Sequence, residues 1–120
     1  MMEKVNLAAK FQLFDDHWSP KIIGEVANLY LKAVKLKGEF VWHRHETEDE
    51  LFYVTKGRLV IKLRDGDVTL EPGEFAVIPH GVDHLPVAEE EVHVLLLEPK
   101  TTVNTGDVSS ERTVAALERI

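Results

Sequence analysis

The amino-acid sequence predicts an all-β fold, and two features of the chain point to it. Short runs rich in β-branched and aromatic residues follow one another over most of the 120 residues. Each run is bounded by Gly, Pro or Asp, at intervals typical of sandwiches and barrels. A chain of this length forms one domain and buries roughly two thirds of the surface that it exposes when unfolded. We therefore expect a β core at about residues 21–98, between an N-terminal segment (1–20) and a C-terminal tail (99–120).

Eight runs are the candidate strands. In chain order they read KIIGEV, NLYLKAVKLKG, ELFYVTKG, RLVIKLRDG, DVTLEPG, EFAVIPHG, DHLPVA and EVHVLLLEP. The pair Asp65-Gly66, between the fourth and fifth runs, is typical of a tight hairpin turn. The sequence contains no internal repeat and no low-complexity linker that would divide this series.

The alternation of side chains along a strand predicts which residues face the core. In RLVIKLR, the alternation places Leu59 and Ile61 on the inward face. In ELFYVTK, Phe52 and Val54 form the more apolar face. Glu50 has the same parity as these two residues, so a carboxylate is also expected to point inward.

Short helices are predicted at both ends of the chain. Near the N-terminus three large apolar residues recur at helical spacing, namely Leu7, Phe11 and Phe14. Asn6, directly before them, is a suitable N-cap, so one or two helical turns should dock on the core. At the C-terminus, SSERTVAALERI (109–120) predicts a second short helix with Val114 and Leu117 facing inward.

The composition argues against several classes of function. The formal net charge is −7, from 14 basic and 21 acidic residues, which is unfavourable for binding nucleic acid or an anionic membrane. The chain has no cysteine, so a disulfide framework and thiolate chemistry are excluded. The N-terminus lacks the pattern of a signal peptide, and no apolar run is long enough to span a membrane. These features predict a cytoplasmic protein.

Two of the six histidines lie one residue apart in the stretch WHRHETEDE. On an extended chain His43 and His45 point to the same side, and Glu50 opens the next inward face. His84 follows a Pro-x-Gly turn and can enter the same end of the fold. Three imidazoles and one carboxylate can hold a first-row metal at about 2.0–2.2 Å. The alternative is a solvated loop, which is how we interpret the intervening acidic residues Glu46, Glu48 and Asp49.

The same residues, with a set of turn residues, resemble the two motifs of the cupin superfamily. The first motif is matched by Gly38, His43, His45, Glu50 and Gly57, with one residue fewer than usual between Gly38 and His43. The second motif is matched by Gly73, Pro79, Gly81 and His84, whereas Ala88 replaces the family's Asn. The chain looks like the small single-domain cupins of the phosphomannose-isomerase-like type. This resemblance implies a double-stranded β-helix, an antiparallel jelly-roll barrel, with one divalent ion bound at its mouth by His43, His45, Glu50 and His84.

A largely apolar cavity is expected behind the metal. Its predicted lining consists of Phe52, Val54, Leu59, Ile61 and His93. His93 has an alternative role as a core histidine, because EVHVLLLEP is apolar on both faces. Lys32 and Lys35 have opposite parity, so only one can point inward, and a phosphorylated sugar would require more positive charge.

The sequence leaves three classes of function open. The first is a metal-dependent enzyme of oxygenase, isomerase or lyase type that acts on a small organic molecule, with Glu50 as candidate general base. The second is a non-catalytic module that binds or senses a small ligand through the same metal. The third is a structural or storage protein, which the intact ligand set disfavours. Nitrogen and oxygen ligands without sulfur suit Mn, Fe, Ni, Co or Zn.

A homodimer is also predicted, because the N-terminal segment contains more apolar surface than one small barrel requires. The residues concerned are Leu7, Phe11, Phe14 and Trp18. The run KIIGEV has the composition of an edge strand that a partner could cover. Two-fold dimers are the commonest oligomers, so we expect this segment at a dimer interface. The alternative is that these aromatic residues cap their own barrel.

Overall fold

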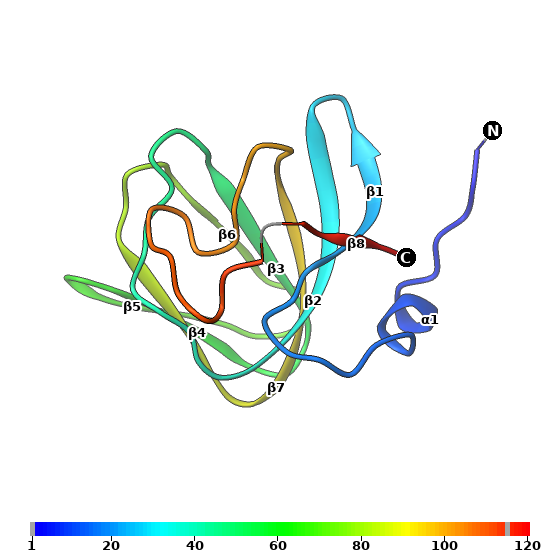
Figure 1. The fold of residues 1–120 in the computed structure, drawn as a ribbon. Coiled ribbons are helices and arrows are strands. Elements are labelled where there is room, and N and C mark those ends of the chain that lie inside the picture. Colours follow the sequence, from blue (N-terminus) through cyan, green and yellow to red (C-terminus); the bar gives the residue numbers. More distant parts are fainter. Residues whose placement is uncertain (1, 115) are drawn as a thin grey trace.

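The computed structural model describes residues 2–114 and 116–120 as an all-β fold, which confirms the predicted class (Figure 1). The strands are β1 (Lys21–Val26), β2 (Leu29–Glu39), β3 (Glu50–Lys56), β4 (Leu59–Leu63), β5 (Gly66–Leu70), β6 (Phe75–Ile78), β7 (His84–Pro99) and β8 (Glu118–Arg119). One short helix, α1 (Leu7–Phe11), precedes them. No helix in the described part of the chain has the length and apolar character that crossing a membrane would require.

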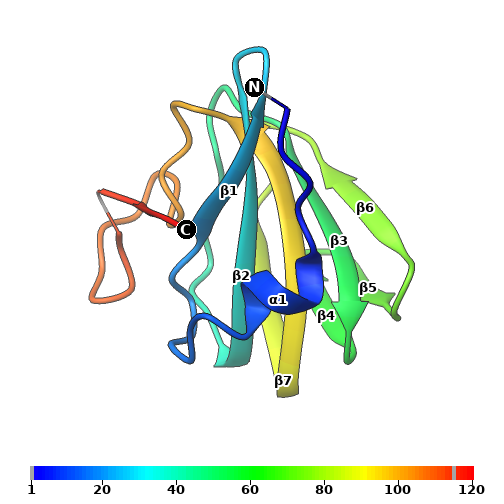
Figure 2. The ribbon, with the colours of Figure 1, turned by 90° about the vertical axis from the view of Figure 1, so that its right-hand side faces the viewer.

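Two long antiparallel strands form the centre of the barrel. β2 and β7 pair from Leu29–Pro99 at one end to Glu39–Val87 at the other. The C-terminal half of β7 also pairs with β3, and its N-terminal end pairs with β4. Because β7 takes part in both pairings, it links β3 and β4 within one sheet. Figure 2 shows β2 and β7 at its centre, with β1 on one side and β3 and β6 on the other.

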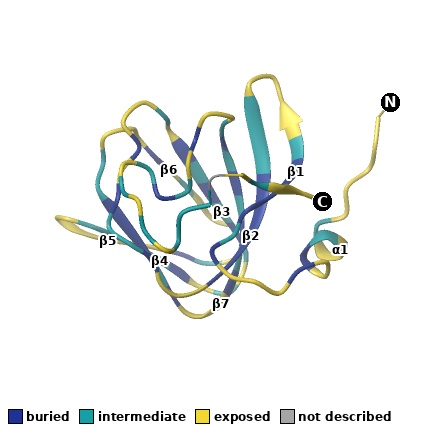
Figure 3. Cartoon of the chain, in the orientation of Figure 1, coloured by how far each residue is buried: buried dark blue, intermediate teal, exposed yellow. Residues whose placement is uncertain are grey.

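The inward side chains of these strands fill the barrel. Val54, Leu59 and Ile61 are fully buried, as the strand parity predicts. They pack with Val34 and Leu36 of β2 and with the alternate residues of β7 in one core cluster. Burial alternates along β3 and the C-terminal half of β7, whereas residues 32–36 of β2 are all buried. Figure 3 shows buried residues along the strands and exposed ones in the loops between them. The barrel is therefore filled by side chains at the level of Val54, Leu59 and Ile61.

The N-terminal segment packs against the outside of β2. Asn6 caps α1 by accepting a hydrogen bond from the backbone N–H of Ala9 at 2.9 Å, as expected. Phe11 and Phe14 form a second apolar cluster with Ile23 and Ala33. These aromatic rings are buried by their own barrel, which is the alternative interpretation given above.

Two predicted boundaries are wrong. The runs DHLPVA and EVHVLLLEP form one strand, β7, because no turn residue separates them and a register shift opposite Leu36 and Gly38 absorbs the exposed residues 89–91. The predicted C-terminal helix is replaced by turns and the short strand β8, apart from Ala115, which lies outside the described residues. Backbone N–H groups in this segment bond to side chains instead of to the preceding helical turn; that of Val114 donates to Asn104 Oδ1 at 2.8 Å.

Strand β8 also changes the expectation for KIIGEV. Lys21 and Ile22 of β1 pair in parallel with Glu118 and Arg119 of β8. The start of β1 is therefore covered by the same chain.

Candidate metal centre

Backbone pairing brings the histidines of the two motifs together. The backbone N–H of His43 donates to the carbonyl oxygen of His84 at 3.1 Å, and that of His84 donates to His43 at 2.9 Å. The backbone N–H of Gly81 donates to the carbonyl oxygen of His45 at 2.7 Å. The Pro-x-Gly turn is thus fixed against the His-x-His segment, so both motifs deliver their side chains to one point.

The four side chains at this point form a compact buried group, which we call the metal cluster: His43, His45, Glu50 and His84. One potential ligand atom from each lies within 4.8 Å of all the others. Glu50 Oε1 is 3.4 Å from His45 Nε2 and 3.5 Å from His84 Nε2. Ligands bound at 2.0–2.2 Å lie about 3 to 4.3 Å apart, so a small contraction brings these atoms to coordinating distance.

Hydrogen bonds prepare two of the rings for coordination. His43 Nδ1 contacts the carbonyl oxygen of Val41 at 2.9 Å, and His84 Nδ1 contacts that of Val82 at 2.9 Å. A carbonyl oxygen can only accept, so Nδ1 carries the proton in both rings. Each Nε2 therefore keeps its lone pair for a metal, which is the usual arrangement of metal-bound histidine.

Buried atoms without partners show that a cation fits the cluster. His45 Nε2, His84 Nε2 and Glu50 Oε1 are buried and lack a hydrogen-bond partner within the described residues. Leaving such a group unsatisfied costs about 1–3 kcal/mol. A single divalent ion would satisfy all three atoms, so the group can hold a metal ion.

The electrostatics of the cluster also favour a cation. Burial, reinforced by the neighbouring His84, lowers the pKa of His43 to about 4, so this ring stays neutral at physiological pH. Burial alone would lower the pKa of His45, but Glu50 outweighs it and raises that pKa. Burial would raise the pKa of Glu50, yet the neighbouring Glu98, His45 and His84 side chains together hold it well below the usual range. The cluster thus combines an ionised carboxylate with imidazole nitrogens.

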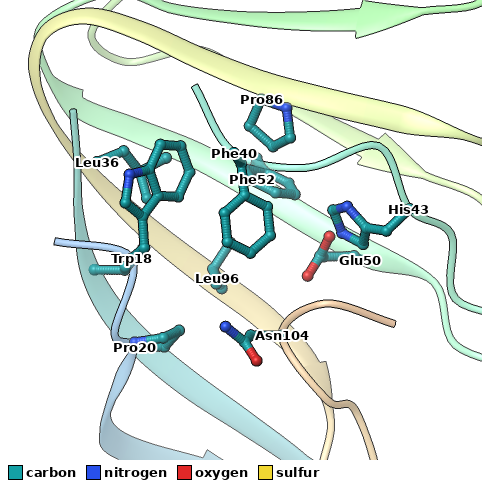
Figure 4. Close-up of a pocket in the computed structure, with 11 residues that line it drawn as sticks. Trp18, Pro20, Leu36, Phe40, His43, Glu50, Phe52, Pro86, Leu96 and Asn104 are labelled. Atoms are coloured by element: carbon teal, nitrogen blue, oxygen red, sulfur yellow. The ribbon is translucent and has the colours of Figure 1, made fainter. Parts of the chain in front are cut away.

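An apolar cavity of about 30 Å³ adjoins the cluster (Figure 4). His43 and Glu50 open onto it, and Asn104 is the other polar residue of its wall. The remaining lining is apolar: Trp18, Pro20, Val34, Leu36, Phe40, Phe52, Pro86 and Leu96. The Trp18 ring stacks on Phe40 with centroids 4.7 Å apart, and its Nε1 donates to the carbonyl oxygen of Lys37 at 2.8 Å. Metal positions left free by the protein would therefore face a small aromatic-walled space.

The C-terminal segment 101–114 closes the end of the barrel beside the cluster. The backbone N–H of Arg44 donates to Asp107 Oδ1 at 3.0 Å, and that of Asp107 donates to the carbonyl oxygen of Arg44 at 2.9 Å. Asn104 lines the cavity, and its side-chain amide donates to the carbonyl oxygen of Arg112 at 2.7 Å. The segment is therefore held against the His-x-His stretch at Arg44. It is the orange loop in Figure 1.

The structure places the predicted cavity residues in three different environments. Phe52 lines the cavity. Val54, Leu59 and Ile61 belong to the solid core, because the barrel is filled at their level. His93 lies on the outer face, where it stacks on Phe11 with ring centroids 4.5 Å apart. Assigning these last four residues to the cavity lining was therefore wrong, although the parity of the three apolar ones was right.

Several residues near the site were not identified from the sequence. Asp49, interpreted as part of a solvated turn, accepts a hydrogen bond from the backbone N–H of His80 and contacts its ring, both at 2.9 Å. It therefore joins the start of β3 to the Pro-x-Gly turn. Glu98 is buried inside the barrel beside Lys32, which is the inward-pointing one of the two lysines considered from the sequence. In the sequence, both residues are charged and occupy inward-facing positions of otherwise apolar strands, which is the feature that could have identified them.

The chain belongs to the cupin family. The family model of the cupin domain matches residues 32–99, which is more than half of the sequence and contains the whole metal cluster. Family membership, fold and the histidine motifs therefore agree.

Solved structures and a curated protein are similar to this chain. A cupin-2 domain containing protein from Shewanella frigidimarina NCIMB 400 is 48% identical, with a TM-score of 0.79 over 80% of this chain and 94% of that one. Protein NMB1881 from Neisseria meningitidis is 30% identical, with a TM-score of 0.75 over 82% of this chain and 100% of that one. Protein YdbB of Bacillus subtilis (strain 168) is 35% identical over 63 residues, which are 52% of this chain and 56% of YdbB.

Proposed function

We propose that this cupin is a metal-dependent enzyme that acts on a small organic molecule with an apolar body. The observation that carries the proposal is the position of the cluster at the wall of an apolar cavity, with His43 and Glu50 open to it. Perturbed titratable groups beside such a cavity are typical of active sites. The fold itself hosts many functions and does not support the proposal.

The lining of the cavity restricts the class of substrate. None of the lining residues in the described chain is a lysine or arginine. Lys32 does point inward, but its ammonium is paired with Glu98 at 2.7 Å. A phosphorylated sugar would leave its charge unpaired here, whereas a neutral molecule with one oxygen donor for the metal is compatible with these walls.

The residues of the cluster have distinct proposed roles. His43, His45, His84 and Glu50 would hold one divalent ion, of Mn, Fe, Ni, Co or Zn. When bound, such an ion supplies Lewis-acid activation and a template for substrate oxygen. Trp18 and Phe40 would orient an apolar substrate against the cluster and exclude water. Glu50 is the proposed general base, because its carboxylate is the acidic group of the cluster that faces the cavity.

Binding of a substrate requires the cavity to enlarge. A cavity of about 30 Å³ has room for one or two water molecules. The C-terminal segment is the part that would have to move, because it contributes Asn104 to the wall and is joined to the His-x-His stretch by hydrogen bonds at Arg44.

A turnover screen tests this proposal. Untagged protein loaded with Fe²⁺ or Mn²⁺ is incubated with small carbonyl, enol and aromatic compounds, and oxygen uptake and products are measured. We expect turnover that is lost in Glu50→Gln and unchanged in Glu91→Gln, a matched substitution outside the cluster. Turnover that persists in Glu50→Gln would contradict the assigned site.

A second candidate function is a ligand-binding or sensing module. The covered mouth of the barrel favours it, because a ligand bound through the metal would be retained rather than exchanged rapidly. Tight binding of a small molecule without any product in the same screen would support this candidate over the enzyme.

We also propose a homodimer in the cytoplasm, without a nucleic-acid or membrane partner. Phe11, Phe14 and Trp18 are buried by their own chain, so the interface needs other apolar surface. Phe75 and Val77 supply it, with 59% and 51% of their surface exposed. Both lie on β6, which pairs only with β3 in the described part of the chain. Sedimentation velocity should give a dimer that Phe75→Glu converts to a monomer; a monomeric wild-type protein would exclude the assembly.

A further inference from the structure

A buried ion pair lies inside the barrel beside the metal cluster. Lys32 Nζ donates to Glu98 Oε1 at 2.7 Å, and each side chain is only 1% exposed. Lys32 comes from β2 and Glu98 from the end of β7, both on the inward faces of their strands. A lysine and a carboxyl group at full burial in an apolar core are expensive to place, so the pair requires an explanation.

The pair is connected to the metal cluster through Glu50. Strands β3 and β7 pair Leu51 with Leu97, so Glu50 and Glu98 are cross-strand neighbours on the inward face of the sheet, close enough for each carboxyl group to shift the pKa of the other. Glu50 in turn faces the imidazoles, with Oε1 at 3.4 Å from His45 Nε2. A continuous polar chain therefore runs from Lys32 through Glu98 and Glu50 to the histidines.

Packing alone gives a weak reason for this arrangement. Replacing a buried ion pair with apolar residues of similar volume is often neutral or stabilising. Lys35 is also buried, and it provides a comparison because its contacts are structural only. It lies on the outer face of the same strand, and its Nζ donates to the backbone carbonyl of Phe14 at 2.6 Å, away from the cluster.

We propose that Glu98 is a positioning residue for Glu50, and that Lys32 holds Glu98 in the orientation required. The side chain of Glu50 can rotate about its single bonds, and its backbone lies at the start of β3. A metal ligand, however, must present its oxygen in a fixed direction. Glu98 fixes that direction from the neighbouring position on β7. This inference rests on the metal binding proposed above and adds two residues to the site.

The test is a calorimetric titration of Mn²⁺ or Co²⁺ into metal-free, untagged protein. The variants are Glu98→Leu, Glu98→Gln, the double variant Lys32→Met/Glu98→Leu, and Lys35→Met as a matched control. Circular dichroism and the melting temperature of each metal-free variant report separately on folding. The double variant removes both charges together, so it keeps the test valid if Glu98→Leu alone leaves Lys32 unpaired and unfolds the protein.

We expect Glu98→Leu and the double variant to weaken metal binding by about 10- to 100-fold, the effect usual for residues that orient ligands. The amide introduced by Glu98→Gln can still accept from Lys32 and donate to Glu50, so this variant should bind metal nearly as well as the wild type. Lys35→Met should bind like the wild type even if it melts earlier. Wild-type affinity in the folded double variant would overturn the positioning role while leaving the metal site intact. Absence of binding by the wild-type protein would overturn the metal site itself, and this inference with it.

Discussion

Two groups of histidines with a carboxylate occur in this protein, and their surroundings differ. The metal cluster contains His43, His45 and His84 around Glu50. The second group, which we call the Glu91 group, consists of His17 and His93 on either side of Glu91. His17 Nε2 is 2.7 Å from Glu91 Oε2, and His93 Nε2 is 3.1 Å from Glu91 Oε1. These residues are partly exposed on the outside of the barrel, where His17 ties the N-terminal segment to β7.

The difference lies in what the ring nitrogens contact. In the Glu91 group the Nε2 atoms have protein partners at hydrogen-bonding distance. In the metal cluster Nδ1 of His43 and of His84 is bound to a backbone carbonyl, and Nε2 of His84 is buried without a partner in the described chain. The two groups of histidines are thus not equivalent. Only in the metal cluster does a buried ring nitrogen keep a lone pair that is available to a metal. The predictions below test this distinction.

Removing an imidazole from the metal cluster should have the largest effect. His84→Ala deletes one of four donors, so the dissociation constant for Mn²⁺ should rise by more than the roughly 100-fold typical of a supporting residue. His93→Ala deletes an imidazole of the Glu91 group and should leave that constant unchanged. Calorimetric titration measures both, with circular dichroism as the check on folding. Equal losses in the two variants would abolish the distinction between the groups.

Acid should destabilise the metal-free protein through His43. The pKa of this ring is lowered to about 4 in the folded state, from 6.5 in the unfolded chain. The unfolded state therefore binds more protons between pH 6.5 and 4, and stability falls as the pH falls through this window. The loss attributable to His43 is at most about 3 kcal/mol. Urea titrations across the window measure it.

The control for this effect is His43→Gln, whose side chain does not titrate. The difference in unfolding free energy between the wild type and this variant should decrease steadily from pH 6.5 to pH 4. A difference that stays constant with pH would show that His43 is not buried as a neutral ring.

The C-terminal segment packs on the metal cluster at Gly106, next to Arg44 and His43. Gly106 has a φ of 60°, and a Cβ at this position would collide with the carbonyl oxygen of Arg44. Gly106→Ala should therefore displace the segment from the cluster at a cost of about 1–3 kcal/mol. Gly24→Ala is the matched control, because its Cβ would meet Leu31 at an ordinary 3.9 Å. Hydrogen exchange should increase over residues 101–114 in the first variant only; unchanged protection would mean that the segment adapts without moving.

The smallest effect is expected in the Glu91 group. The hydrogen bond from His17 is the main reason that the pKa of Glu91 is lowered, and both side chains are well exposed. Glu91→Gln should cost less than about 1 kcal/mol, a loss that salt reduces. Thermal unfolding at low and high ionic strength measures it. A loss of several kcal/mol would show that the group is a structural centre of the fold.

The four members of the metal cluster could be predicted because their placement depends on short-range rules. The alternation of side chains fixes the faces of His43, His45 and Glu50, and the Pro-x-Gly turn directs His84. The same rules identified the inward faces of β3 and β4. They operate over a few residues and require no knowledge of which strands pair.

Residues whose roles depend on long-range register could not be predicted in this way. Lys32 meets Glu98 only because β2 and β7 align Lys32 with Leu96, one inward position away. Trp18 reaches the cavity through a loop in which its own φ is 61°, an uncommon conformation that composition does not reveal. The C-terminal segment is shaped by Asn104, whose side chain bonds to backbone groups eight and ten residues later. Helical spacing therefore gave the wrong prediction there.

The central claim is that the buried imidazoles without protein partners are metal ligands. X-ray absorption spectroscopy of the untagged protein loaded with one equivalent of Co²⁺ tests it most directly, because imidazole rings give a distinct scattering pattern and can be counted. We predict three imidazoles and at least one carboxylate oxygen around the ion in the wild-type protein. His84→Ala should lose one imidazole, and His93→Ala should give an unchanged spectrum. A spectrum with fewer than three imidazoles in the wild type, or one that changes in His93→Ala, would contradict the claim.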